Sequence, residues 1–209
     1  MTNRNKKIRI AIAGIGGVGG YFGGRLSRYY ENADDIEVIF IARGENEKAI
    51  SQNGLRVEHA KGNFVTRPKL VTSDTAKVGV VDYLICCAKS YDLEQMMLEL
   101  SPCIDRATVI LPLLNGIDSS ETVKNIYPQN EVWEGCVYLV SRLTEPGIVK
   151  VTGNMSLLFF GSNEGTHEKL NQLEKIFLSA GIEAKLSGNI QQTIWEKFLL
   201  ISPIATITS

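Results

Sequence analysis

Hydrophobic residues along the chain gather in short runs, and each early run is followed by a segment in which they recur at helical spacing. Nearly continuous apolar runs occupy residues 8–12, 36–42, 80–88 and 108–114. Runs of this kind predict strands of a parallel sheet that helices cover on both faces. Their alternation with helices predicts an α/β fold with a doubly wound parallel sheet.

The pattern changes in the second half of the chain. Residues 132–143 and 147–160 are rich in Val, Leu, Tyr and Phe, and a Thr-Glu-Pro-Gly turn joins them. This predicts two antiparallel strands appended to the parallel sheet. An amphipathic helix is predicted over residues 170–180. Further short strands are predicted over residues 55–57, 64–70 and 182–186.

Glycines at the junction of the first strand and the first helix follow the spacing G-x-G-x-x-G. The first glycine permits a tight turn, the second lets a pyrophosphate come close, and the third lets the helix pack on the strand. Taken alone, the spacing also fits a purely structural glycine turn. Because a strand precedes it and a helix follows, the context favours a Rossmann-type dinucleotide site. The residues assigned to this loop are Gly14, Ile15, Gly16, Gly17, Val18 and Gly19.

Polar residues follow three of the predicted strands at their carboxyl ends, the edge where open α/β sheets bind ligands. Arg43 stands where an acidic residue would bind the free 2′-hydroxyl of NAD, so it favours the 2′-phosphate of NADP. The alternative is a solvated arginine in a loop. Lys89 and Asn115 are candidate ligand contacts, with a solvated lysine and a turn asparagine as the alternatives.

The last stretch of the chain, residues 189–209, predicts a helix with a lysine in its apolar stripe. Lys197 shares a face with the stripe residues Ile190, Ile194, Phe198 and Ile201. Its stem could lie along the apolar surface while the ammonium reaches water. Alternatively, the amine points into a cleft beside the nucleotide site, where desolvation would tune its pKa for catalysis.

The composition of the chain argues against nucleic acid or a membrane as its partner. The 22 Lys and Arg residues nearly balance the 23 Asp and Glu residues, so no broad field favours nucleic acid or an anionic membrane. No apolar run approaches the length of a membrane span. The four cysteines lack metal-ligand or disulfide spacing; Cys86 and Cys87 fit small core residues of a cytoplasmic protein better than a redox pair. We therefore expect a small-molecule partner and no metal.

These features together resemble the ketopantoate reductase (2-dehydropantoate 2-reductase) family, which reduces a keto acid in pantothenate synthesis with NADPH. The matching pieces occur in the family's order over nearly all of the chain. They are the opening IAIAGIGGVGGYFGGRL, Arg43, Lys89 after ICCA, Asn115-Gly116 in LLNG, the turn EPGIV, and AGIEAKLSGNIQQTIWEKF.

The resemblance implies a role for each matched side chain. Lys197 would be the general acid that donates a proton to the keto oxygen of the substrate while NADPH delivers hydride to the adjacent carbon. A protonated lysine also opposes the negative charge that develops on that oxygen. Asn115 would contact both the nicotinamide ribose and the substrate, and Lys89 would approach the same region.

Three positions depart from the family pattern. Many members carry asparagines one and two helical turns after the catalytic lysine, where this chain has Ile201 and Ala205, and a glutamine where it has Leu114. Apolar side chains cannot replace the hydrogen bonds of an amide, so substrate discrimination should differ. The expected reaction is reduction of ketopantoate. The alternatives are reduction of another, bulkier 2-keto acid, and an NADP-binding module without chemistry.

The resemblance also implies a division into domains. Residues 1–187 would form the NADP-binding domain, and residues 188–209 the first helix of a C-terminal all-helical domain. That domain supplies further substrate and cofactor contacts in the family, so this chain is expected to be truncated. The resemblance allows a homodimer formed through the C-terminal domain.

Overall fold

The computed structural model describes residues 7–89, 92–163 and 167–207, with side chains described as far as residue 199. The first part of the chain contains β1 (Ile8–Ala13), α1 (Gly17–Tyr29), β2 (Ile36–Ile41), α2 (Gly44–Asn53), β3 (Leu55–Glu58), β4 (Phe64–Thr66), β5 (Leu70–Thr72), α3 (Thr75–Val78), β6 (Tyr83–Cys86), α4 (Leu93–Glu99) and β7 (Val109–Pro112). The remaining elements are α5 (Ser119–Ile126), β8 (Glu131–Val132), β9 (Glu134–Glu145), β10 (Ile148–Gly161), α6 (Glu168–Ser179), β11 (Glu183–Leu186) and α7 (Ile190–Ile207).

The first sheet has six strands in the order β5-β2-β1-β6-β7-β8, and every neighbouring pair is parallel. Alternate residues of its strands face two separate cores. Ile10 and Ile12 of β1 pack with α1 and α6, whereas Ala11 and Ala13 pack on the other face with α4 and α5. The doubly wound α/β fold predicted from the apolar runs is confirmed.

The second sheet lies beyond α1 and contains β9, β10, β11, β3 and β4. The predicted antiparallel pair of β9 and β10 is correct, but these strands form a sheet of their own rather than extending the parallel one. The predicted single strand over residues 64–70 is wrong in its extent. It divides into β4, which pairs with β3, and β5, which pairs with β2. Pro68 lies between them, where the chain passes from one sheet to the other.

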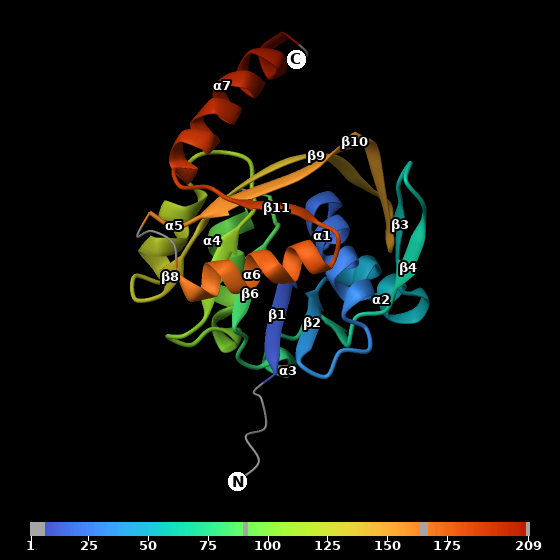
Figure 1. Ribbon diagram of the computed structural model, residues 1–209. Coiled ribbons are helices and arrows are strands. Elements are labelled where there is room, and N and C mark those ends of the chain that lie inside the picture. Colours follow the sequence, from blue (N-terminus) through green and yellow to red (C-terminus); the bar gives the residue numbers. More distant parts are fainter. Residues whose placement is uncertain (1–6, 90–91, 164–166, 208–209) are drawn as a thin grey trace.

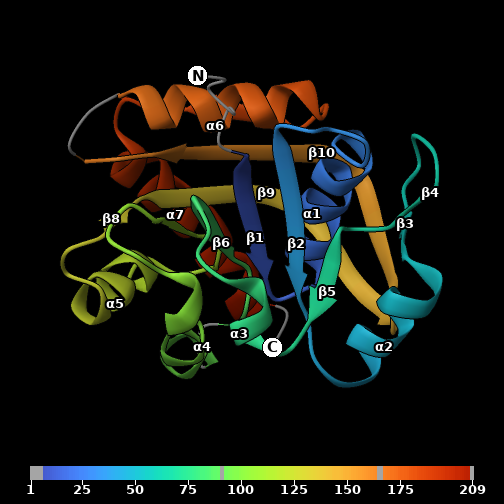
Figure 2. The ribbon, with the colours of Figure 1, turned by 90° about the horizontal axis from the view of Figure 1, so that it is seen from below.

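Helix α1 is enclosed by both sheets, and its glycines make this possible. A Cβ at Gly20 would lie 2.5 Å from Val149 of β10, and one at Gly23 would lie 3.0 Å from the ring of Phe40 in β2. In Figure 2, β9 and β10 run across the strands of the first sheet on the side of α1. Glycine is therefore needed on two faces of this helix because the backbone of α1 is nearly in contact with its neighbours.

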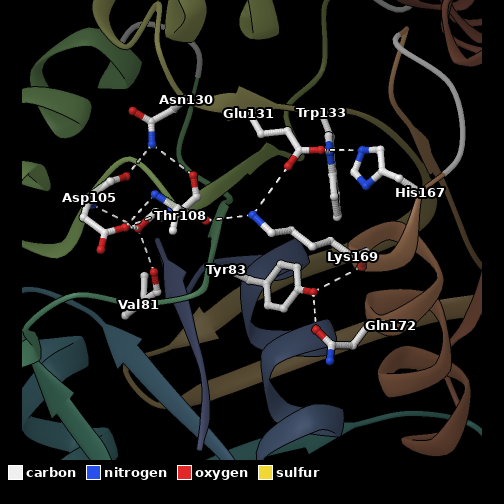
Figure 3. A network of polar contacts seen from close by, with 11 residues as sticks. Val81, Tyr83, Asp105, Thr108, Asn130, Glu131, Trp133, His167, Lys169 and Gln172 are labelled. Atoms are coloured by element: carbon white, nitrogen blue, oxygen red, sulfur yellow. Dashed lines mark hydrogen bonds and ion pairs between the residues drawn. The ribbon is translucent and has the colours of Figure 1, made fainter. Parts of the chain in front are cut away.

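A polar network fastens α6 to the amino ends of the first sheet (Figure 3). The Tyr83 hydroxyl donates to Gln172 Oε1 at 2.7 Å, and Lys169 Nζ lies 3.6 Å from Glu131 Oε2. The same glutamate accepts a hydrogen bond from Trp133 Nε1 at 3.0 Å. These contacts fix α6 against the amino ends of the strands, opposite the edge where the candidate ligand residues lie.

Helix α7 projects from the two sheets (Figure 1). The predicted helix is confirmed, but among its described side chains the apolar stripe is buried only at the start. Ile190 is 1% exposed, whereas Phe198 is 40% exposed and stacks edge-on against Trp195. Ile201 and Ala205 lie in the part of α7 whose side chains the structure does not describe. In the described part of the chain, no helix is both long and apolar enough to cross a membrane.

Candidate active site

The glycine loop between β1 and α1 packs tightly against its neighbours at Gly14 and Gly19 but has open space at Gly16. A Cβ at Gly14 would lie 3.0 Å from the backbone of Ala88, and one at Gly19 would lie 2.1 Å from Gly14 O. By contrast, a Cβ at Gly16, the N-cap of α1, would meet nothing within 4 Å. The first N–H groups of α1 have no partner within the helix. The loop therefore has the free space and the donors that a diphosphate requires.

A cleft of about 300 Å³ lies at the carboxyl ends of β1, β2 and β6. The strand order reverses between β1 and β6, so the cleft occupies the switch point where open α/β sheets bind ligands. Gly14, Ile15 and Gly16 line it from the glycine loop, and Arg43 and Lys89 line it from the ends of β2 and β6. The structure thus brings together the predicted loop and both predicted cations.

Arg43 and Asn46 shape the β2 side of this cleft. The Arg43 guanidinium forms an ion pair with Glu99 at the end of α4. Asn46 donates from Nδ2 to Ile15 O at 2.8 Å, and its Oδ1 accepts from Gly147 N at 2.8 Å. Asn46 therefore ties the glycine loop to the β9–β10 turn, a role that local sequence pattern does not reveal.

A second group of side chains surrounds Lys197. Its Nζ donates to Asn115 Oδ1 at 3.1 Å, although 82 residues separate the two in sequence. The amine also lies 5.7 Å from the ring centre of Tyr138 in β9, within range of a cation–π contact. Of the two orientations considered for Lys197, the structure shows the amine directed at Asn115 and partly buried.

The surroundings of Lys197 change its acidity. Burial lowers the pKa of Lys197 below the ordinary lysine value, and the nearby Cys136 sulfur opposes this change. Burial also raises the pKa of the Cys136 thiol. The site therefore combines a lysine that releases its proton more readily than an ordinary lysine with a thiol that releases its proton less readily than an ordinary thiol.

The two groups of residues meet along β9. Asn115 and Lys197 do not line the cleft that contains Arg43 and Lys89. However, a Cβ at Gly17 would lie 2.4 Å from Ser141 O in β9, and the same strand carries Tyr138. Strand β9 therefore connects the start of α1 with the surroundings of Lys197.

Leu114 and three of the four cysteines are buried. Leu114, at the position where many family members carry glutamine, is buried in the core on the α4 face. Cys86, Cys103 and Cys136 are buried, and all four thiols are free. Burial raises the pKa of Cys86 to about 12, so it is inert at neutral pH. The prediction that the adjacent cysteines are core residues holds for Cys86, whereas Cys87 is half-buried and lines the cleft.

Sequence reasoning missed three residues of these two groups: Asn46, Glu99 and Tyr138. Asn46 and Glu99 are polar residues on helices, where sequence alone does not distinguish a site residue from a solvated one. Tyr138 lies in a strand rich in apolar residues, and its ring fits that pattern. No group of three or more His, Cys, Asp or Glu side chains that could hold a metal occurs within the ranges the structure describes.

The chain is similar to known proteins over most of its length. The sequence model of the family described as "Ketopantoate reductase PanE/ApbA" matches residues 10–165. The uncharacterized oxidoreductase YkpB of Bacillus subtilis is 32% identical over 203 residues, which cover 97% of this chain and 65% of that protein. The 2-dehydropantoate 2-reductase of Lactococcus lactis is 30% identical over 91% of this chain and 60% of that enzyme. The chain thus spans less than two thirds of the length of these curated relatives.

Solved structures of similar fold include members of the same family. The crystal structure of 2-dehydropantoate 2-reductase from Porphyromonas gingivalis matches with a TM-score of 0.92 and 40% identity, covering 97% of this chain and 72% of that one. The ternary structure of D-mandelate dehydrogenase with NADH and anilino(oxo)acetate matches with a TM-score of 0.79 and 25% identity, covering 93% and 61%. By its sequence and its fold, this chain belongs to the ketopantoate reductase family.

Proposed function

We propose that this chain carries the cofactor site and the catalytic lysine of a cytoplasmic, NADPH-dependent reductase of a 2-keto acid, with ketopantoate as the first substrate to test. The observation that carries the proposal is the contact of Lys197 Nζ with Asn115 Oδ1 at 3.1 Å. In this proposal residues 1–187 form the nucleotide-binding domain. Residues 188–209 begin a helical domain that completes the substrate site and forms a homodimer.

The residues of the cleft fit a dinucleotide. The open space at Gly16 and the start of α1 suit the diphosphate, with Gly14, Ile15, Gly17, Val18 and Gly19 completing the loop. The planar fork of Arg43 suits the 2′-phosphate of NADP. Lys89, which lines the same cleft, adds positive charge for the phosphates and the nicotinamide end. The cofactor, when bound, supplies a hydride to the carbonyl carbon of the substrate.

Lys197 and Asn115 handle the proton. The Lys197 ammonium donates a proton to the keto oxygen, which becomes a hydroxyl while the lysine becomes a neutral amine. Its lowered pKa, caused by burial, eases this release. Asn115 accepts a hydrogen bond from the amine and so fixes its position, and its amide N–H group remains available for the substrate. The positive charge also stabilises the oxygen as it gains electron density.

Loss of the lysine amine tests this assignment. In the full natural protein, Lys197→Ala should lower kcat for NADPH oxidation with ketopantoate by about 10²- to 10⁴-fold, the usual contribution of a general acid. Lys150→Ala, which removes an exposed lysine from β10, is the matched control and should leave kcat unchanged. Equal rates for the two variants would refute the role of Lys197.

A second candidate substrate is a bulkier 2-keto acid. Ile201 and Ala205 stand where many family members carry asparagines, and the fold matches D-mandelate dehydrogenase in complex with anilino(oxo)acetate. Comparing kcat/KM for ketopantoate with that for aromatic and branched 2-keto acids separates the candidates. Tight NADPH binding without turnover of any of them would instead indicate a nucleotide-binding module.

A further inference from the structure

Acidic side chains line the cleft opposite Arg43. Asp92 and Glu99 come from the segment of α4, and Glu99 is held at both carboxylate oxygens. Its Oε1 accepts from Gln95 Nε2 at 2.9 Å, and its Oε2 accepts from Arg43 Nη2. The guanidinium that is proposed to bind a 2′-phosphate therefore already faces a fixed negative charge.

We propose that Glu99 is a specificity-determining residue that limits the preference of this protein for NADPH over NADH. The inference rests on the proposed function, because it assigns the cleft to a pyridine nucleotide. A 2′-phosphate carries between one and two negative charges near neutral pH, and it has to compete with Glu99 for Arg43. A free 2′-hydroxyl, in contrast, can donate a hydrogen bond to the same carboxylate. Glu99 thus weakens the binding of NADPH and strengthens the binding of NADH.

The place of Glu99 in α4 indicates that it does not serve the stability of the fold. It is the last residue of the helix, where a negative charge opposes the helix dipole, and the last turn of α4 contains no basic residue. Its ion pair with Arg43 is also exposed, with 41% of the Glu99 side chain and 60% of the Arg43 side chain accessible. Exposed pairs of this kind add little to folding, so the carboxylate can be neutralised without loss of structure.

Removing the charge while keeping the shape tests the proposal. Dissociation constants for NADPH and NADH, which differ only in the 2′-phosphate, are measured by calorimetry for the wild type and for Glu99→Gln. We expect NADPH to bind about three- to tenfold more tightly to the variant, the effect of one partly exposed charge, while NADH binds equally or more weakly. Because the effect is electrostatic, it should shrink as the salt concentration rises.

Two further variants sharpen the test. Glu94→Gln removes an exposed charge from the same helix at a residue that does not line the cleft, and it should leave the ratio of the two constants unchanged. Glu99→Asp keeps the charge and should retain most of the wild-type ratio. An unchanged ratio in Glu99→Gln, in a protein that binds NADPH, would overturn the role of Glu99 and leave the proposed function standing. Failure of the wild type to bind either nucleotide would overturn both.

Discussion

The glycine loop and the surroundings of Lys197 are built in different ways. The loop is fixed mainly by close backbone contacts among β1, α1 and the end of β6, and Asn46 adds one side-chain hydrogen bond to Ile15 O. Lys197, Asn115 and Tyr138 come instead from α7, from the loop after β7 and from β9. Among the α7 side chains that the structure describes, only that of Ile190, at the start of the helix, is buried. The nucleotide half of the site is therefore set by the sheet, whereas the chemical half depends on how one projecting helix is held.

The largest expected effect comes from disrupting the glycine loop, which is built mainly from backbone contacts. Gly19→Ala places a Cβ 2.1 Å from Gly14 O and 3.0 Å from Cys87 Cβ, and neither the loop nor the strand end can move away easily. The free energy of unfolding should fall by about 3 kcal/mol or more, and nucleotide binding should be lost. Thermal unfolding and NADPH titration measure both effects.

Gly188→Ala is the control for this change, since a Cβ there would meet nothing within 4 Å. It should leave both measurements as in the wild type. If Gly19→Ala bound NADPH as the wild type does, the close packing of α1 on the loop would not be the basis of the nucleotide site.

An intermediate effect is expected when a single side chain is removed from the edge of the cleft. Arg43→Ala should weaken the binding of NADPH by about 1–3 kcal/mol, the range for a lost hydrogen bond to a charged group. The binding of NADH should change much less. Arg67→Ala removes an exposed arginine that does not line the cleft and should affect neither nucleotide. Equal weakening of both nucleotides by Arg43→Ala would count against a contact with the 2′-phosphate.

The smallest expected effect is a shift in the pH dependence of kcat. This shift tests the surroundings of Lys197, which are built from side chains. Reduction needs protonated Lys197, so kcat should fall as the pH rises through the pKa of this lysine. Burial lowers that pKa, so the decline should occur at a lower pH than for an ordinary lysine. The pH dependence of kcat measures it, and NADPH affinity over the same range serves as the control. A rate that stays constant up to the pH where ordinary lysines titrate would contradict the role of Lys197.

The sequence predicts the glycine loop better than the surroundings of Lys197, because the loop depends on local pattern and the surroundings of Lys197 depend on distant contacts. The glycine loop, the flanking strand and helix, and Arg43 and Lys89 at strand ends are local patterns, and the structure places them along one cleft. The position of Lys197 was predicted from helical spacing, but its contact with Asn115 depends on how α7 sits against β9. Local pattern carries no information about that arrangement. The resemblance to a known family, rather than periodicity, connected the two residues.

The second sheet was missed for a related reason. Its strands were mostly recognised, but β3 pairs with β10, whose residues lie about 90 positions later in the chain, and β4 then pairs with β3. Alternation of apolar and polar residues defines which side of a strand is buried, not which strand is its neighbour. Glu99 was missed because its partner, Arg43, is likewise distant in sequence.

The enclosure of α1 between two sheets also bears on how the chain reaches its native state. The helix leaves the ribosome early, but the strands that cover its outer surface, β9 and β10, are synthesised more than a hundred residues later. Until then Gly17 and Gly20 lack their partners in β9 and β10, and closure requires contacts between distant parts of the chain, which form slowly. Shortened chains that end before residue 134 should therefore leave α1 uncovered and tend to aggregate during expression.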